Sequence, residues 1–223
     1  MNAKEPLVLC LTNTVAADLT ANVLLALGAK PAMMEEPTEA AALAAVSDCV
    51  LVNVGTVNAA QAEVMRAALK VCREQRIPWV LDPVAVHLLE YRRALIKEFL
   101  AYEPAAIRGN QAEIEFLKSS ALSVKCPVLA TGEVDRLWRS GLNSEPALEI
   151  AGGVKLLQAV TATGCSQGAA VAAAIGRGQK PFDALEATSR LFKRAGENAA
   201  LKSSLPGTFR AYFVDQLRLI PIF

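Results

Sequence analysis

The sequence has few of the residue types that build several common kinds of site. It contains a single histidine, His87, and aromatic residues make up only 5% of the chain. A Ser/His or Cys/His catalytic pair would have to include His87, which we interpret instead as a local packing or capping residue. The five cysteines are an odd number without CxxC spacing, which argues against a disulfide framework and a zinc site. We interpret four of them as small buried hydrophobic residues.

An excess of one charge and long apolar runs are also absent. Lys plus Arg number 23 and Asp plus Glu number 22, for a net charge of +1. No basic run is interleaved with aromatic residues, so the sequence predicts no nucleic-acid partner. No apolar stretch reaches membrane-spanning length, and no signal-peptide cleavage region follows the short apolar run near the N-terminus. We therefore expect a cytoplasmic protein without a membrane partner, whose ligand is a small molecule.

The sequence does contain many apolar residues and a regular alternation of expected strands and helices. The 53% hydrophobic content over 223 residues favours one domain, residues 1–223, with a large core. Strands are expected over residues 6–12, 48–54, 78–84, 105–109 and 125–132, and helices over 60–73, 86–102, 163–177, 181–202 and 207–219. Short apolar runs alternating with helical segments predict an α/β fold, with a mainly parallel central sheet and helices on both faces. Ligands should then bind beyond the carboxyl ends of the strands.

Polar residues follow the first three of these strands. Asn13 is either a helix cap or a ligand contact, and Gly55 either makes a turn or lets a ligand approach the backbone. Asp82 ends a strand that should be buried, where its carboxylate needs a partner such as Mg²⁺, an arginine or a helix N-terminus. Met33 lies in an apolar turn over residues 31–34, which is either core filler or one wall of a small hydrophobic pocket.

The next strand end carries "IRGNQAEI", which places Arg108, Asn110 and Glu113 within about one helical turn. The planar guanidinium of Arg108 suits a phosphate, and Glu113 has the chemistry to help hold a metal. Together with Asp82, Thr131 and the turn at Cys165, Arg108 and Glu113 form the kind of set that Mg²⁺-dependent phosphoryl transfer needs.

The stretch "AVTATGCSQGAAVAAA", residues 159–174, leads from a turn of small residues into an alanine-rich helix. Such a turn aims backbone N–H groups and the Cys165 thiol at an anion. A thiol at a helix N-terminus is expected to have a lowered pKa.

Several long motifs occur together and in one order. They read "LTNTVAADLTANVLLALGAKPAM", "NVGT", "PWVLDPVAV", "YEPAAIRGNQAEI", "ATGEVD", "TATGC" and "PGTFRAYFVDQL". Over nearly the whole chain this set resembles the hydroxyethylthiazole kinases of thiamine biosynthesis and salvage, which belong to the ribokinase-like superfamily. The resemblance implies a ribokinase-like fold and a homotrimer with active sites between subunits. It also implies transfer of the ATP γ-phosphate to the hydroxyl of 4-methyl-5-(2-hydroxyethyl)thiazole.

The resemblance also assigns roles to residues. Met33, Asn13 and Gly55 would contact the thiazole, and Asp82 with Glu113 would bind or orient Mg²⁺. The ATP contacts would be Arg108, Thr131, Asn110 and Gly164. Residues 162–165 would form an anion hole, with Ala162 on the substrate side and Cys165 at the position where related sugar kinases carry an aspartate base.

The chain departs from the family pattern at several places. Ala162 replaces a glycine of the anion turn, Ala159 replaces a lysine, and the bulky His87 replaces a glycine near the expected phosphate path. If position 162 needs a positive φ, alanine there costs on the order of 1 to 3 kcal/mol, or roughly ten- to a hundredfold in rate. The chain before the first strand is short, and so is the connection after Glu113, which would uncover part of the sheet and open or reshape the nucleotide side.

The leading hypothesis is therefore a Mg²⁺- and ATP-dependent hydroxyethylthiazole kinase. The alternative is a catalytically impaired or inactive homologue that binds a thiazole-like ligand or serves as a structural partner.

Overall fold

The computed structural model describes residues 5–220, so the two ends of the predicted domain, residues 1–4 and 221–223, lie outside the described residues. Its centre is one eight-stranded sheet in the order β2-β1-β3-β4-β5-β6-β7-β8. The strands are β1 (Leu7–Leu11), β2 (Lys30–Met33), β3 (Cys49–Asn53), β4 (Trp79–Asp82), β5 (Ala106–Asn110), β6 (Val128–Thr131), β7 (Asp135–Trp138) and β8 (Leu148–Ile150). β1 to β6 pair in parallel, while β7 and β8 are antiparallel additions at one edge. The predicted mainly parallel sheet is confirmed.

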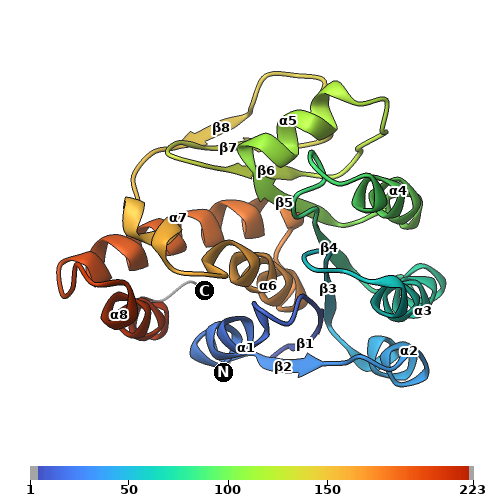
Figure 1. Ribbon diagram of the computed structural model, residues 1–223, viewed down its shortest axis with the longest axis horizontal. Helices are drawn as coiled ribbons and strands as arrows, with labels where there is room; N and C mark the ends of the chain where they lie inside the picture. Colours follow the sequence, from blue (N-terminus) through green and yellow to red (C-terminus); the bar gives the residue numbers. More distant parts are fainter. Residues whose placement is uncertain (1–4, 221–223) are drawn as a thin grey trace.

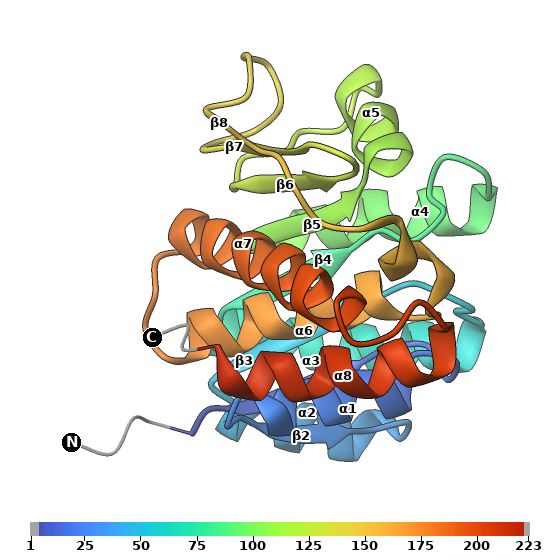
Figure 2. The same ribbon diagram turned by 90° about the vertical axis from the view of Figure 1, so that its left-hand side faces the viewer.

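Helices cover both faces of the sheet, as predicted (Figure 1). One face packs against α2 (Pro37–Val46), α3 (Ala59–Gln75), α4 (Glu90–Phe99) and α5 (Gln111–Ser119). The other face packs against α1 (Ala17–Ala26), α6 (Thr163–Gly176) and α7 (Pro181–Ala200). Figure 2 shows α8 (Pro206–Leu219) lying along the outside of this second layer. Two short 3₁₀ helices, η1 (Leu100–Tyr102) and η2 (Lys155–Ala159), complete the described elements.

The strand residues explain this layering. Val50 and Val52 of β3 face the cluster formed with α2 to α5, whereas Cys49 and Leu51 face the cluster formed with α6. Both sets are fully buried, because helices on both faces leave no solvent-facing side to a central parallel strand. This is why the sequence shows continuous apolar runs rather than alternation.

The five predicted strands and five predicted helices are all present, with differences at their ends. Residues 31–34, interpreted above as an apolar turn, lie mostly in β2, an edge strand that Pro31 can join because an edge needs fewer backbone donors. The short strands β7 and β8 were not predicted. The helix expected over 86–102 begins only at Glu90, because a turn holding Ala85 at φ +56° precedes it.

The short connection after Glu113 still returns to the sheet in parallel. α5 supplies the crossover from β5 to β6, and the register pairs Ile107 with Val128 and Asn110 with Thr131. Within residues 5–220, no helix combines the length and the apolar character needed to cross a membrane.

Candidate active site

The sheet order brings the predicted site residues to one edge. Met33 ends β2, Asp82 ends β4 and Thr131 ends β6, and Asn13 and Gly55 follow β1 and β3 directly. In space these carboxyl ends follow one another in the strand order β2-β1-β3-β4-β5-β6. The expected thiazole residues therefore occupy one half of the edge and the expected ATP residues the other half, with Asp82 between them.

Asp82 is the most buried charged group at this edge, with no exposed surface. Its Oδ2 accepts a hydrogen bond of 2.7 Å from Asn53 Nδ2 and lies 3.8 Å from Arg108 Nη1. Its buried Oδ1 has no hydrogen-bond partner. Burial raises the pKa of the Asp82 carboxyl to about 7, an effect that the charge of Arg108 opposes and that of Glu113 reinforces.

Arg108 projects from β5 with only 7% of its surface exposed. Its guanidinium donates to Thr131 Oγ1 at 2.8 Å and to Gln167 Oε1 at 3.1 Å, in addition to the ion pair with Asp82. Thr131 Oγ1 in turn donates to the carbonyl of Gly109 at 3.2 Å. The fork of Arg108 is thus fixed by three neighbours, which preorganises it for an anion.

Glu113 and Asn110 form a reciprocal cap at the start of α5. The Asn110 side chain accepts from the Glu113 N–H at 2.9 Å, and Glu113 Oε2 accepts from the Asn110 N–H at 2.7 Å. Glu113 Oε1 accepts from the Ala85 N–H at 2.8 Å. Glu113 therefore holds the turn after β4, where Ala85 has a positive φ, against the start of α5.

The turn before α6 has the conformation that the sequence left open. Ala162 is the N-cap residue of α6, at φ +71° and ψ 5°, and no side chain caps this helix. The backbone N–H groups of the first turn are therefore available to an anion. An alanine in this left-handed conformation is strained, because its Cβ crowds the backbone.

Gly164 lies against Arg108 in this first turn. A Cβ built on Gly164 would stand 2.8 Å from Arg108 Nη2 and 2.9 Å from Nη1. Real Cβ atoms do not approach nitrogen so closely, so glycine is what lets the guanidinium reach the N-terminus of α6. Two positively polarised groups, the arginine and the helix terminus, thus meet at one point.

Cys165 follows at the third position of α6, and the expectation of a lowered thiol pKa is wrong. Burial and the nearby charge of Asp82 raise the pKa of Cys165 to about 11, although contacts from Asn53, Arg108 and Asn13 act in the opposite direction. Desolvation exceeds the effect of the helix terminus because most of the side chain is removed from water. The thiol is consequently protonated at neutral pH.

Asn53 is a site residue that the sequence analysis missed. Its Oδ1 accepts from the Gly55 N–H at 2.9 Å and from Asn13 Nδ2 at 3.1 Å, while its Nδ2 donates to Asp82. Asn13 Nδ2 also lies 3.6 Å from Cys165 Sγ, and Asn13 Oδ1 accepts from the Ala16 N–H at 2.9 Å. Asn13 thus closes a turn just before α1 but is not its N-cap, which is Ala16 without a side-chain cap, and a ligand contact of Asn13 stays a prediction.

The same network explains Gly55. A Cβ there would lie 2.7 Å from Asn13 Nδ2 and 2.9 Å from Asn53 Oδ1, so the glycine makes room for two buried amides. The signal in the sequence was the polar Asn53 at the end of an otherwise apolar strand.

A cavity of about 670 Å³ opens over the half of this edge that carries the expected ATP residues. The predicted residues that line it are Arg108, Asn110, Glu113, Thr131, Ala162, Gly164 and Cys165. Met33, Asn13, Gly55 and Asp82 do not line it. The lining also includes the unpredicted Gln167, Asp135 and Lys193. The structure thus gathers the expected phosphate contacts around one cavity together with Ala162, which was expected on the substrate side, and leaves Met33, Asn13 and Gly55 outside its lining.

His87 lies outside the lining of this cavity. Its backbone carbonyl accepts a hydrogen bond from Arg93 Nη2 at 2.5 Å, and its buried Nδ1 has no hydrogen-bond partner. The ring is therefore a packing element of the turn before α4, and its expected place near the phosphate path is not borne out by the lining.

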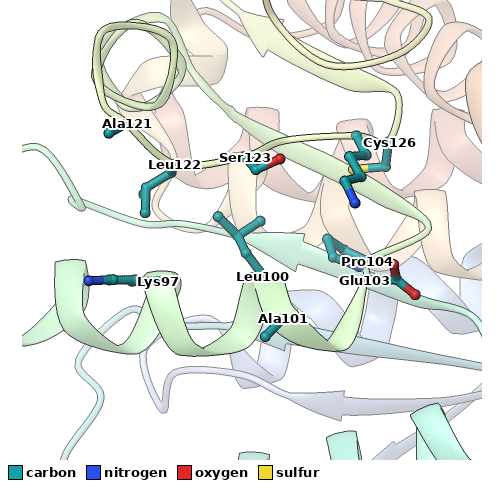
Figure 3. A pocket seen from close by; sticks show the side chains of 10 residues that line it. Lys97, Leu100, Ala101, Glu103, Pro104, Ala121, Leu122, Ser123 and Cys126 are labelled. Atoms are coloured by element: carbon teal, nitrogen blue, oxygen red, sulfur yellow. The ribbon is translucent and has the colours of Figure 1, made fainter.

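A second cavity, of about 530 Å³, lies at the opposite ends of β5 and β6 (Figure 3). Leu100 and Pro104 precede β5, and Leu122 and Cys126 precede β6. The connection after α5 thus lines a cavity at the amino ends of these strands, and the expected opening of the nucleotide side by its shortening stays a prediction.

Asp82 has an oxygen that suits a magnesium ion bound beside phosphates. Among the described residues no group of three or more His, Cys, Asp or Glu side chains is placed to hold a metal. Mg²⁺ needs no such cage, since one or two carboxylates with water and phosphate oxygens complete its shell. The unpartnered Oδ1 of the buried Asp82 is an oxygen ligand of the required kind, whereas both Glu113 oxygens already accept backbone N–H groups.

Comparisons with known proteins show which sequences and structures this chain resembles. The sequence profile of the hydroxyethylthiazole kinase family matches residues 1–125 and 114–222. A hydroxyethylthiazole kinase of Salmonella schwarzengrund is 40% identical over 238 aligned residues, covering 96% of this chain and 88% of the relative. The structure of a hydroxyethylthiazole kinase protein from Pyrococcus horikoshii superposes with a TM-score of 0.88 at 30% identity, covering 97% of this chain and 89% of that one.

A more distant neighbour extends the fold comparison. An ADP complex of Bacillus subtilis pyridoxal kinase has a TM-score of 0.61 at 14% identity, covering 86% of this chain and 92% of that one. At this identity the likeness speaks for the ribokinase-like fold alone.

Proposed function

This chain belongs to the hydroxyethylthiazole kinase family, and we propose that it transfers the γ-phosphoryl group of ATP to the hydroxyl of 4-methyl-5-(2-hydroxyethyl)thiazole in thiamine biosynthesis. The observation that carries this function is the convergence of Arg108, the uncapped N-terminus of α6 and Asp82 beside one cavity. Phosphoryl transfer depends mainly on positioning and charge neutralisation, which these groups supply.

ATP occupies the cavity with its phosphates at the α6 end. Arg108 and the first-turn N–H groups of α6 neutralise phosphate oxygens. The close approach at Gly164 brings the guanidinium and these N–H groups together. The Thr131 hydroxyl accepts a hydrogen bond from Arg108 and so helps to hold the guanidinium in place. Asn110 lines the cavity, where it would contact ATP.

The thiazole lies on the other half of the edge, against Met33, Asn13 and Gly55. Cys165 stands at the junction, because it lines the ATP cavity while its Sγ contacts Asn13 at 3.6 Å. We assign Cys165 to contact the reacting hydroxyl, with Ala162 beside it. A protonated thiol can do this, because the loose transition state of phosphoryl transfer needs little help from a base.

Asp82 would hold Mg²⁺, and Glu113 would orient it, when the ion enters with ATP. The bound ion would neutralise charge on the transferred phosphoryl group. Asn53 keeps the Asp82 carboxylate turned so that Oδ2 is occupied and Oδ1 stays free.

In a homotrimer with active sites between subunits, a second subunit would complete the thiazole side, where Met33, Asn13 and Gly55 lie outside the lining of the cavity. Large apolar side chains are exposed next to this edge: Val15 after β1 at 60% exposure, and Leu88 at 68% and Leu89 at 45% after β4. Exposed apolar groups gathered near a site favour a protein contact there. The proposal covers residues 1–223 as one kinase domain, and a cytoplasmic location stays a prediction.

The alternative of an inactive homologue is not favoured, because the altered turn at Ala162 keeps the left-handed conformation and Arg108, Asp82 and Cys165 are all in place. The test is turnover of the purified chain with Mg-ATP and the thiazole alcohol, followed by ADP release and by mass spectrometry of the phosphorylated product. Arg108→Met serves as the inactive control. Absence of product, while a family member forms it in the same assay, would overturn the proposal, and calorimetric binding of the thiazole without ATP would then support the inactive homologue.

A further inference from the structure

Helix α7 carries a row of polar side chains on the side that faces the ATP cavity. Ser189, Lys193 and Glu197 recur at intervals of four residues, which places them on one face of the helix. We call these three residues the α7 polar stripe. None of them belongs to the phosphate or thiazole groups described above, yet Ser189 and Lys193 line the cavity.

Lys193 is the centre of this stripe and is almost fully buried, with 7% of its surface exposed. Its Nζ donates to the carbonyl oxygens of Gly132 at 3.4 Å, Glu133 at 3.2 Å and Gly152 at 2.9 Å. It also lies 3.2 Å from Asp135 Oδ1. All four partner residues line the ATP cavity. A single ammonium group therefore joins the β6–β7 turn to the segment after β8.

The other two members of the stripe tie down the same segments. Ser189 Oγ donates to Asp135 Oδ2 at 2.8 Å, and Asp135 Oδ1 accepts from the Gly132 N–H at 3.0 Å. Glu197 Oε1 accepts from the Gly153 N–H at 2.6 Å. The two parts of the chain on either side of the cavity are thus both fastened to α7.

The glycines after β8 show how closely this wall rests on the stripe. Gly152 and Gly153 have φ values of +100° and +86°. A Cβ on Gly152 would stand 2.8 Å from Glu197 Oε1, and one on Gly153 would stand 3.2 Å from Lys193 Cγ. Glycine at both positions therefore lets this wall lie directly against the stripe.

From this geometry we infer that Lys193 and Glu197 are positioning residues for the nucleotide. They fix the position of the two cavity walls that contact it, the β6–β7 turn and the segment after β8. The inference rests on the proposed ATP-dependent function. It predicts a selective effect, because the stripe touches walls of the ATP cavity and none of the thiazole residues. Loosening the walls should weaken nucleotide binding and leave binding of the thiazole alcohol unchanged.

The first test replaces Glu197, because its removal leaves no buried charged group without a partner. Glu197→Ala should raise the KM for ATP by about tenfold, with kcat and the KM for the thiazole alcohol nearly unchanged. Glu197→Gln keeps an acceptor for the Gly153 N–H and should restore the KM. Arg190→Met, on the same helix but paired with Glu186 at the surface, is the matched control and should behave as the unsubstituted chain.

The second test replaces Lys193 by methionine together with Asp135→Asn, so that no carboxylate is left buried without its partner. The dissociation constant of ADP with Mg²⁺, measured by calorimetry, should rise by about ten- to a hundredfold, and circular dichroism should show an intact fold. Unchanged ADP binding in both folded variants would overturn the inference, as would an equal loss in the Arg190→Met control or absence of ADP binding by the unsubstituted chain. Failure of the proposed function is seen separately, as ADP binding by the unsubstituted chain without turnover of the thiazole alcohol.

Discussion

Asn53 Nδ2 donates a hydrogen bond of 2.7 Å to Asp82 Oδ2 across two neighbouring strands, where neither residue has any exposed surface. The register pairs these residues directly, as the last pair of β3 and β4. The bond occupies one oxygen of the carboxylate and leaves the other for a ligand. Asn53 therefore fixes the orientation of Asp82.

Replacing Asn53 by alanine should remove this control. The change removes the hydrogen bonds that Asn53 makes to Asp82 Oδ2 and to the Gly55 N–H, at a cost in folding free energy of about 1 to 3 kcal/mol. We also expect kcat to fall at least about tenfold, since the ion pair with Arg108 at 3.8 Å is then the only interaction that orients Asp82 Oδ2 among the described residues. Urea unfolding and steady-state kinetics measure the two effects. Asn198→Ala is the control and should leave kcat unchanged. It removes a partly buried hydrogen bond between the side-chain amides of Asn198 on α7 and Gln216 on α8.

The stability of the unliganded chain should fall as the pH rises from about 4 to about 7. Asp82 has its pKa raised from 3.8 to about 7 in the folded state, so the folded protein binds more protons than the unfolded chain in this interval. Ionising this buried group costs on the order of 4 kcal/mol once the pH is above 7. Asp82→Asn should flatten this part of the curve of unfolding free energy against pH. Asp215→Asn, at an exposed position of α8, should not, and a curve equally steep in both variants would contradict the assignment.

Gly164→Ala should abolish most of the activity while the protein stays folded. The new methyl group would meet both terminal nitrogens of Arg108 at less than 3 Å, so the guanidinium must move away from the start of α6. A loss of about a hundredfold in kcat/KM for ATP is the expected result. Gly207→Ala is a close control, because α8 offers its Cβ open space and alanine there should only stabilise the helix. Activity retained in Gly164→Ala would show that Arg108 need not touch the α6 terminus.

Ala162→Gly should stabilise the protein and raise its turnover. The left-handed conformation at φ +71° costs an alanine about 1 to 2 kcal/mol, and glycine removes this strain while adding some freedom to the unfolded chain. The expected gain is on the order of 1 kcal/mol in a thermal melt. Strain already present in the folded chain does not itself change the rate, so an increase of up to ten- to a hundredfold in kcat/KM is expected from removing the Ala162 methyl group from the anion turn. Ala173→Gly, inside the same helix, should instead destabilise by about 1 kcal/mol. A lower melting temperature in Ala162→Gly would show that the turn is not strained.

The sequence by itself determined five strands of the sheet, β1, β3, β4, β5 and β6, and the family. It also predicts the edge of the sheet at which ligands bind. Strands buried on both faces consist of nearly continuous apolar residues, and polar residues such as Asp82 and Arg108 lie at or near their carboxyl ends. Because parallel strands end at one edge, local motifs were enough to gather Asp82, Arg108 and Thr131 around one site.

Only the tertiary structure determined the burial, the long-range contacts and the pKa values of those residues. The pKa of Cys165 rises because other elements remove its thiol from water, and no local pattern measures that burial. Asn53, Gln167 and the α7 polar stripe gain their roles through contacts 29 to 61 residues away in the chain, which local periodicity cannot register. The positive φ of Ala162 was a conditional expectation until the packing of η2 and α6 fixed the turn. Long-range packing and desolvation, rather than propensity, complete this site.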